Sequence, residues 1–185
     1  VLGDGIAYII KARVQLLRDI GAAVSPDNAW QLIQGIETLS LRVERHVQNA
    51  VAVAQWLEAH PDVASVSYSG LPSSPWYATA QTYAPKGVGA VLSFELKGGV
   101  DAGRALVDSV ELFSHVANIG DVRSLIIHPA STTHSQLTPE QQLTSGVTPG
   151  LVRLSVGLEN IDDIIADLEA GFAAARAVVA ANAAV

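Results

Sequence analysis

Arg153 is the residue whose type fits its surroundings least, because it lies in an otherwise apolar run at residues 151–156 (LVRLSV). The run alternates like a strand, so Leu151, Arg153 and Ser155 are expected on one face. A guanidinium there needs an anion, since a buried charge without a partner is costly. The residues alone leave two explanations open: a salt bridge to an internal Asp or Glu, or bidentate binding of a ligand carboxylate.

A second candidate is the turn at residues 118–121 (NIGD), which follows a short extended stretch at residues 114–117. Asn118 and Gly120 favour a tight turn with exposed backbone N–H groups. Such groups could donate hydrogen bonds to a ligand carboxylate. An ordinary turn without a ligand is the alternative, and the local sequence by itself favours it.

Two histidines, His128 and His134, flank a hydroxyl-rich segment at residues 129–133 (PASTT), which is typical of a ligand-facing loop. No carboxylate stands at metal-ligand spacing beside them, so structural roles are expected and a metal site is not. No serine lies in a G-x-S-x-G motif, so hydrolase-type nucleophilic catalysis has no support.

The three lysines of the chain give no candidate for a Schiff base. Lys86 and Lys97 stand in turn-like segments that are expected to be exposed, and Lys11 falls on the polar side of an amphipathic helix. A Schiff-base lysine works when it is desolvated or held against a cofactor. None of these local sequences predicts that setting.

The composition argues against several classes of partner. Of the 185 residues, 49% are hydrophobic and 16% are charged, and the formal net charge is −7. Phosphate binding needs clustered Lys and Arg, so neither nucleic acid nor an anionic membrane surface is expected. No apolar run is long enough to cross a bilayer. The lack of Cys excludes disulfides, thiolate metal ligands and a Cys nucleophile, and it suits a cytoplasmic protein.

The elements that must position these residues change character near residue 60. Residues 7–19 have helical periodicity, and the helical pattern resumes at Ser25 and Pro26 and continues to about His60, with Gly35 as the expected kink or break. Further on, strands are expected at residues 63–68, 90–96, 125–127 and 151–156, and helices at 76–83, 101–110, from 138, and at 160–179. The sequence therefore predicts a helical segment at residues 1–60 and an α/β domain at residues 61–185.

Two blocks, residues 118–134 (NIGDVRSLIIHPASTTH) and 150–159 (GLVRLSVGLE), resemble the C-terminal signature of the Cys/Met-metabolism family of pyridoxal-phosphate (PLP) enzymes. The resemblance extends upstream through residues 34–42 (QGIETLSLR) and 68–72 (YSGLP), and it fades only in the Ala-rich tail. A start at Val1 that leads directly into an amphipathic helix agrees with it, since it predicts a piece cut from a longer protein.

The resemblance implies the C-terminal small domain of a fold-type I, aminotransferase-like enzyme, in which a large domain carries PLP. The helix that starts at Pro26 would bridge the two domains. Arg153 matches the family arginine that binds the substrate α-carboxylate, and Asn118 matches the position that assists it. The Schiff-base lysine and the other cofactor-binding residues are implied to lie upstream of Val1, so that the chain alone is expected to be inactive.

Within the family, residues 118–121 and 128–136 resemble the branch that replaces the acetate of O-acetylhomoserine with sulfide in methionine biosynthesis. Cystathionine-processing relatives and methionine γ-lyases usually carry Ser where Asn118 stands. The family resemblance also implies a homotetramer and makes the N-terminal part of the same protein a partner of this chain. The alternatives are a cystathionine γ-synthase or methionine γ-lyase piece, or a non-catalytic α/β module that holds a small carboxylate with Arg153.

Overall fold

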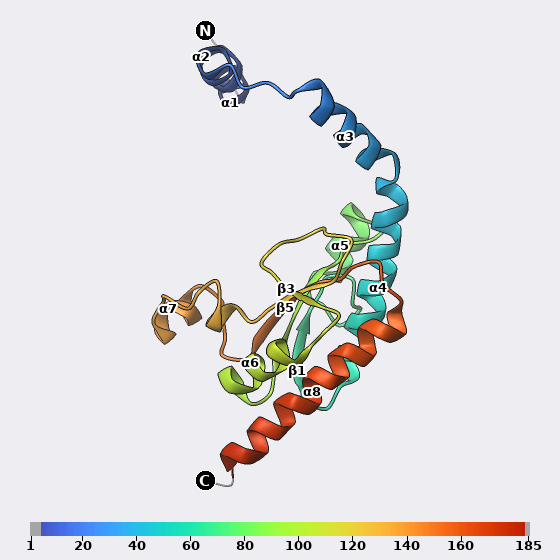
Figure 1. Cartoon of the computed structure of the whole chain (residues 1–185), viewed down its shortest axis with the longest axis vertical. Helices are drawn as coiled ribbons and strands as arrows, with labels where there is room; N and C mark the ends of the chain where they lie inside the picture. The colour runs from blue at the N-terminus through green and yellow to red at the C-terminus, as the bar shows by residue number, and fades with distance from the viewer. Residues whose placement is uncertain (1–4, 184–185) are drawn as a thin grey trace. The chain divides into compact units, whose positions relative to one another are not determined.

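The computed structural model describes residues 5–183, and the chain divides into two compact units, Val1–Ser40 and Leu41–Val185 (Figure 1). The first unit is helical, and none of its described residues is buried. Its elements are α1 (Ala7–Lys11), a π-helical turn η1 (Ala12–Leu17), α2 (Arg18–Ile20), α3 (Pro26–Glu37) and the first residues of α4 (Leu39–Ala59).

Local signals set the helix ends in this unit. Gly21 ends α2 in the left-handed conformation, with φ of 70°. Ser25 begins α3, because its side chain accepts a hydrogen bond from Asn28 N at 3.2 Å. The predicted break at Gly35 is wrong: Gly35 lies inside α3, and the interruption falls at Thr38. A lone glycine keeps its backbone N–H, so it weakens a helix without ending it.

The second unit is built on a five-stranded mixed sheet, which confirms the predicted α/β class. Its strands are β1 (Val63–Ser67), β2 (Val91–Leu96), β3 (Ser114–His115), β4 (Leu125–Ile127) and β5 (Leu151–Ser155). They lie in the order β1-β2-β5-β4-β3, and only the β3–β4 pair is parallel. The strand that carries Arg153 is therefore the central strand of the sheet.

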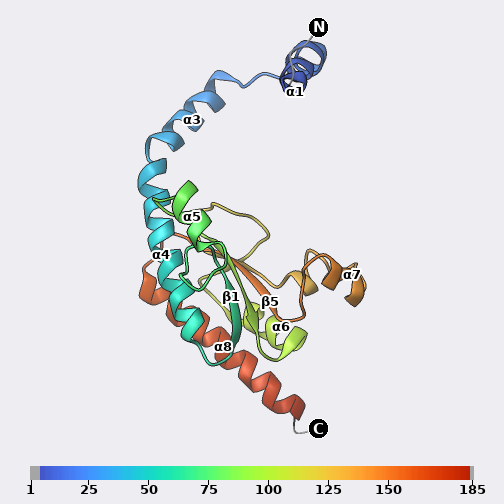
Figure 2. The same cartoon turned by 180° about the vertical axis from the view of Figure 1, so that it is seen from behind.

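The helices of this unit are α4, α5 (Tyr77–Tyr83), α6 (Gly99–Ser109), α7 (Pro139–Thr144) and α8 (Ile161–Ala183), together with a 3-10 turn, η2 (Pro129–Ser131). The end of α4 meets α8, where Trp56 packs against Phe172, and both helices can be followed in Figure 2. The core joins one face of the sheet to α4, α6 and α8, with Leu57, Phe94, Leu106, Leu154 and Phe172 among its most buried members. The buried positions of α4, from His46 to Leu57, recur at helical spacing.

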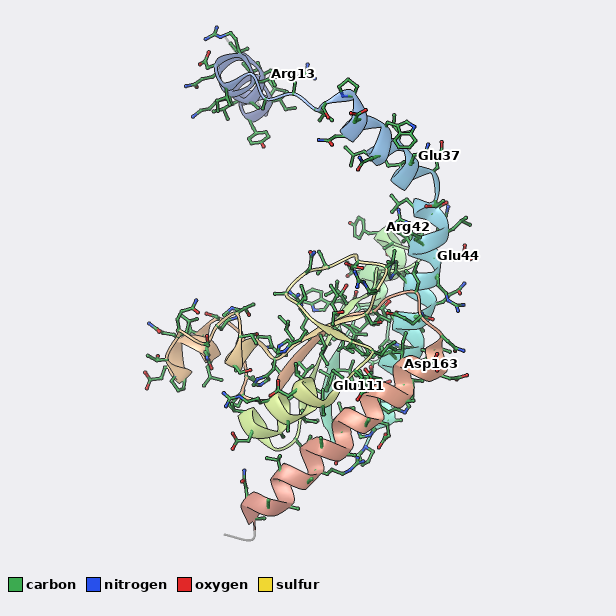
Figure 3. The ribbon with its side chains drawn as sticks, viewed as in Figure 1. Arg13, Glu37, Arg42, Glu44, Glu111 and Asp163 are labelled. Atoms are coloured by element: carbon green, nitrogen blue, oxygen red, sulfur yellow. The ribbon has the colours of Figure 1, made fainter. Side chains whose placement is uncertain are left out.

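The predicted division at residue 60 remains a prediction about the whole protein. Within the described chain, the later part of α4 belongs to the α/β unit, because its apolar side is buried in the core of that unit. Exposed side chains such as Glu44 project from its other side (Figure 3).

Polar side chains cap the starts of two helices of this unit. Thr138 forms a full capping box with Gln141, and the Asn160 side chain accepts a hydrogen bond from Asp162 N at 3.0 Å. Asp101, in contrast, does not cap α6. Gly98, with φ of 105°, is the N-cap, and Asp101 lies in the first turn, where the helix dipole still favours it.

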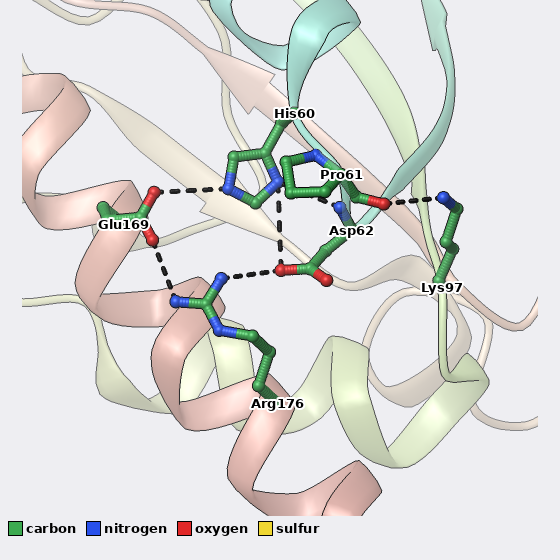
Figure 4. Close-up of polar contacts among 6 residues, drawn as sticks. All are labelled: His60, Pro61, Asp62, Lys97, Glu169 and Arg176. Atoms are coloured by element: carbon green, nitrogen blue, oxygen red, sulfur yellow. Dashed lines mark hydrogen bonds and ion pairs between the residues drawn. The ribbon is translucent and has the colours of Figure 1, made fainter.

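A polar cluster joins the end of α4 to α8 (Figure 4). Arg176 donates to Asp62 at 2.7 Å and to Glu169 at 2.9 Å, and His60 Nε2 lies 3.2 Å from Glu169 Oε2. The His60 ring stacks on Phe172 at 4.0 Å between centroids, and Trp56 packs against both rings. Among residues 5–183, no helix combines the length and apolar character that crossing a membrane requires.

Candidate functional site

Arg153 lies on the face of β5 that points away from the helices. Its strand neighbours Val152 and Leu154 are fully buried in the core, so Arg153 must face the other way, as the alternation predicted. It pairs across the sheet with Ser93 on β2 and Ile127 on β4. The side chain is half-buried, which keeps it partly accessible from that face.

The guanidinium of Arg153 is only partly satisfied. Its Nη2 donates to the backbone carbonyl of Asn118 at 3.0 Å, while its Nε is buried and has no hydrogen-bond partner. None of the ion pairs found within residues 5–183 includes Arg153. The internal salt bridge left open by the sequence is therefore not made in the described part of the chain. A buried N–H without a partner costs roughly 1–3 kcal/mol, which an incoming carboxylate would offset.

Asn118 meets Arg153 through its main chain rather than its side chain. The Asn118 side-chain oxygen accepts from Ile119 N at 2.9 Å, which closes the turn locally. Gly120, with φ of 76°, then donates its N–H to Ser155 Oγ at 3.2 Å. The turn thus lies across β5, held by Arg153 at one point and by Ser155 two residues further along the same face.

The far end of the same loop is fixed by residues that the sequence did not single out. Glu159 accepts hydrogen bonds from both Ser124 N and Ser124 Oγ, at 2.6 and 2.9 Å. Ser124 Oγ in turn accepts from Gly157 N at 2.8 Å. Glu159 and Ser124 are 35 residues apart. Local spacing carries no signal of such a contact, although both residues fall inside the blocks that carry the family resemblance.

His128 has a structural environment. It is fully buried, its Nε2 donates to Pro149 O at 2.8 Å, and its Nδ1 lies 2.9 Å from Ser131 Oγ. Burial in an apolar setting is the main cause that lowers its pKa below the ordinary histidine value. The other histidine of the segment, His134, contacts Thr133 Oγ1 at 2.8 Å. The described residues contain no cluster of side chains suited to a metal ion.

The lysines and the cavities lie outside this arrangement. Lys11, Lys86 and Lys97 are all exposed, and Lys97 donates to Pro61 O at 2.6 Å. A cavity of about 630 Å³ lies between the end of α6 and α8, where Figure 3 labels Glu111 and Asp163. Its lining includes neither Arg153 nor Asn118, so it does not extend the candidate site.

The chain matches a known enzyme family over most of its length. The sequence profile of the family described as Cys/Met metabolism PLP-dependent enzyme matches residues 4–173. Over 168 residues the chain is 60% identical to the O-acetyl-L-homoserine sulfhydrylase of Leptospira meyeri, covering 90% of this chain and 38% of that protein. It is 56% identical to the O-acetyl-L-homoserine sulfhydrylase of Corynebacterium glutamicum, covering 91% and 38%. The chain therefore spans less than half the length of these relatives.

Two solved structures have the same fold. One is a putative O-acetylhomoserine (thiol)-lyase of Campylobacter jejuni, with a TM-score of 0.81 and 45% identity, covering 92% of this chain and 41% of that one. That structure contains an N'-pyridoxyl-lysine-5'-monophosphate. The other is cystathionine γ-synthase of Xanthomonas oryzae in complex with cystathionine, with a TM-score of 0.80 and 40% identity, covering 92% and 44%.

Proposed function

The chain belongs to the Cys/Met-metabolism family of PLP-dependent enzymes, and from that premise we propose that it is the C-terminal part of an O-acetylhomoserine sulfhydrylase. The whole enzyme would exchange the acetate of O-acetyl-L-homoserine for sulfide, giving homocysteine and acetate. The chain would form the small domain of a fold-type I architecture. The similarity to sulfhydrylases at 56 and 60% identity supports this activity over those of other family members.

The observation that carries the proposal is the half-satisfied guanidinium of Arg153. Asn118 O holds Nη2 at 3.0 Å, while the buried Nε keeps a free donor. A guanidinium fixed in this way suits a planar carboxylate, which accepts two parallel hydrogen bonds. We assign Arg153 to the substrate α-carboxylate and Asn118 to holding Arg153 in place. Orientation of a bound substrate lowers a barrier by several kcal/mol, roughly 7–11 at the extreme.

The described residues do not fit the cofactor itself, and we assign none of them to it. The exposure of all three lysines supports a Schiff-base lysine in the part of the relatives' length that this chain does not span. PLP, when bound, supplies the electron sink for carbanionic substrate carbons. This chain supplies the grip on the carboxylate that presents those carbons.

We also propose that the first unit makes contacts in the whole enzyme, with the N-terminal part of the same protein and with further copies in a tetramer. Its helix α3 exposes large apolar side chains, namely Trp30, Leu32, Ile33 and Ile36. Large exposed apolar side chains gathered on one helix in this way are typical of an interface.

Substitution of Arg153 in the full-length enzyme tests the carboxylate assignment. Arg153→Ala should raise KM for O-acetylhomoserine by at least about tenfold and also lower kcat, because misoriented substrate reacts poorly. Arg153→Lys should be impaired too, since an ammonium cannot make the bidentate contact. Arg104→Lys, at an exposed position of α6, is the matched control and should leave both constants unchanged. An unchanged KM in Arg153→Ala would overturn the assignment.

The reaction itself is tested by the choice of second substrate. Sulfide should yield homocysteine, whereas cysteine should be a poor nucleophile and methionine should not be cleaved. Efficient cystathionine formation from cysteine would favour a γ-synthase, and release of methanethiol from methionine would favour a γ-lyase. Failure of the full-length protein to act on any of these substrates would favour a carboxylate-binding module.

A further inference from the structure

The carboxylate of Glu159 holds the far end of the loop that carries Asn118. Its two oxygens accept hydrogen bonds from the N–H and the hydroxyl of Ser124, which is fully buried. Hydrogen bonds to an ionised acceptor are stronger than neutral ones. The two bonds therefore hold the position at which the loop re-enters the sheet, since Ser124 directly precedes β4.

The chain around Glu159 packs against the loop too closely for any side chain between them. Gly157 donates to Ser124 Oγ, and Leu158 N donates to Val122 O at 2.9 Å. A Cβ atom at Gly157 would collide with Glu159 Oε2, Ser124 N and the backbone of Arg123. Residues 157–159 and 122–124 thus form one closely joined pair of segments.

Helix α4 holds the Glu159 side of this pair. The Asn49 side chain donates to Gly157 O at 3.0 Å and to Glu159 O at 2.9 Å. His46 Nδ1 donates to Val156 O at 2.6 Å. Both side chains are buried, so these contacts are shielded from water. The helix fixes residues 156–159, and Glu159 in turn fixes the Asn118 loop.

We propose that Glu159 is a positioning residue for the carboxylate grip. It sets the path of residues 118–124, so that Asn118 O meets Nη2 of Arg153 and leaves Nε directed to the ligand. An arginine side chain carries about 2 kcal/mol of rotamer entropy, so an anchor that orders it beforehand favours binding. This inference rests on the proposed function, because it assumes that Arg153 binds the substrate carboxylate.

The test uses the full-length holoenzyme and the variant Glu159→Gln, which keeps the shape of the side chain but loses the charge and one acceptor. KM for the amino-acid substrate should rise about five- to tenfold, with a smaller change in kcat. In an Arg153→Ala background, Glu159→Gln should change KM by less than about twofold, because residues that act through one contact are not additive. Glu140→Gln, a carboxylate on α7 whose side chain makes no hydrogen bond among residues 5–183, is the control.

A binding measurement separates positioning from general damage. The inhibition constant of an α-amino acid that lacks a leaving group should rise in Glu159→Gln, while that of the corresponding amine without a carboxylate should not. Equal effects on both inhibitors, or equal effects with and without Arg153, would overturn the positioning role. If Glu159→Gln fails to fold, Ser124→Ala is measured in the same way and judged by the same outcomes. It removes the hydroxyl, with its bonds to Glu159 Oε2 and from Gly157 N, and keeps the bond from Ser124 N to Glu159.

The measurements distinguish an error about the carboxylate site at Arg153 from an error about the role of Glu159. If Arg153→Ala leaves KM unchanged, the proposed carboxylate site is wrong. If Arg153→Ala raises KM while Glu159→Gln and Ser124→Ala both leave it unchanged, the site stands and only the role of Glu159 is wrong.

Discussion

The guanidinium of Arg153 has a hydrogen-bond partner at Nη2 but, among the described residues, none at Nε. A backbone carbonyl restrains Nη2, while the buried Nε lacks an acceptor. A backbone acceptor carries no net charge, so it orders the side chain without neutralising it. An internal carboxylate would have done both and left no charge for a ligand. The choice of a carbonyl partner therefore keeps the arginine ordered and still attractive to an anion.

The burial of His128 predicts that the folded chain loses stability in mild acid. Burial lowers its folded-state pKa, so the unfolded chain takes up a proton first as the pH falls below about 6.5. Its contribution to stability is therefore complete above that pH and is lost as the pH falls through the folded-state pKa. Urea denaturation of the chain between pH 8 and 5 measures this.

The control for His128 is a second histidine. His128→Gln should flatten the decline below pH 6.5, whereas His134→Gln should preserve it. An identical decline in His128→Gln and the unmodified chain would contradict the assignment to His128.

The sequence predicted the orientation of Arg153 in the candidate site but not the role of Glu159. The face of Arg153 followed from alternation along one strand, and the structure confirms it. The role of Glu159 could not be predicted, because its partner Ser124 is 35 residues away and lies in a loop with no periodicity. Its hydrogen bonds depend on how β5 and β4 are placed in the sheet, which is a tertiary property.

At the scale of elements, the packing of α6 depends on a glycine beside His128. A Cβ atom on Gly103 would lie 2.6 Å from the His128 ring, which is held by Pro149 O and Ser131 and cannot easily move. Gly103→Ala should lower the free energy of unfolding by about 1–3 kcal/mol through overpacking. Chemical denaturation of the chain measures the change.

Gly35→Ala is the matched control for Gly103→Ala. Gly35 also lies inside a helix, but a Cβ there meets nothing within 4 Å. Alanine has the higher helix propensity, so this variant should be neutral or more stable by up to about 1 kcal/mol. A destabilisation equal to that of Gly103→Ala would mean that helical glycine, and not the contact with His128, is responsible.

Elements were predictable where their ends carry local chemistry. Ser25 and Thr138 mark helix starts by hydrogen bonds within four residues, and both predictions are confirmed. The start of α6 was missed by two residues, because two adjacent glycines with positive φ redirect the chain before Asp101. The order of the strands was not predictable from local signals, since it depends on long-range pairing.

At the scale of the whole α/β unit, Arg176 ties α8 to the chain that follows α4 through Asp62, and within α8 it also donates to Glu169. The Arg176 hydrogen bond is the main cause that lowers the pKa of Glu169 below its ordinary value. A carboxyl with a lowered folded-state pKa stabilises the fold above its unfolded-state pKa, and that stability is lost as the pH falls through the folded-state value.

Arg176→Gln should therefore weaken the dependence of stability on pH in the acid range below about pH 4.5. Because the pair is largely exposed, the effect at neutral pH should be small and should shrink further in high salt. Arg123→Gln, whose exposed guanidinium lies 3.8 Å from Asp121, is the control and should leave the acid range unchanged. A large loss of stability at neutral pH would instead indicate that the Arg176 contact carries packing as well as charge.

The ring cluster at the end of α4 also gives the molecule a built-in optical probe. Of the three tryptophans, Trp30 and Trp76 are 64% and 67% exposed, while Trp56 packs against both His60 and Phe172. In a chain with Trp30→Phe and Trp76→Phe, the remaining indole should emit at shorter wavelength than an indole in water. Its emission should shift to the red only when α8 leaves α4, so fluorescence alone would follow the opening of the α/β unit in real time.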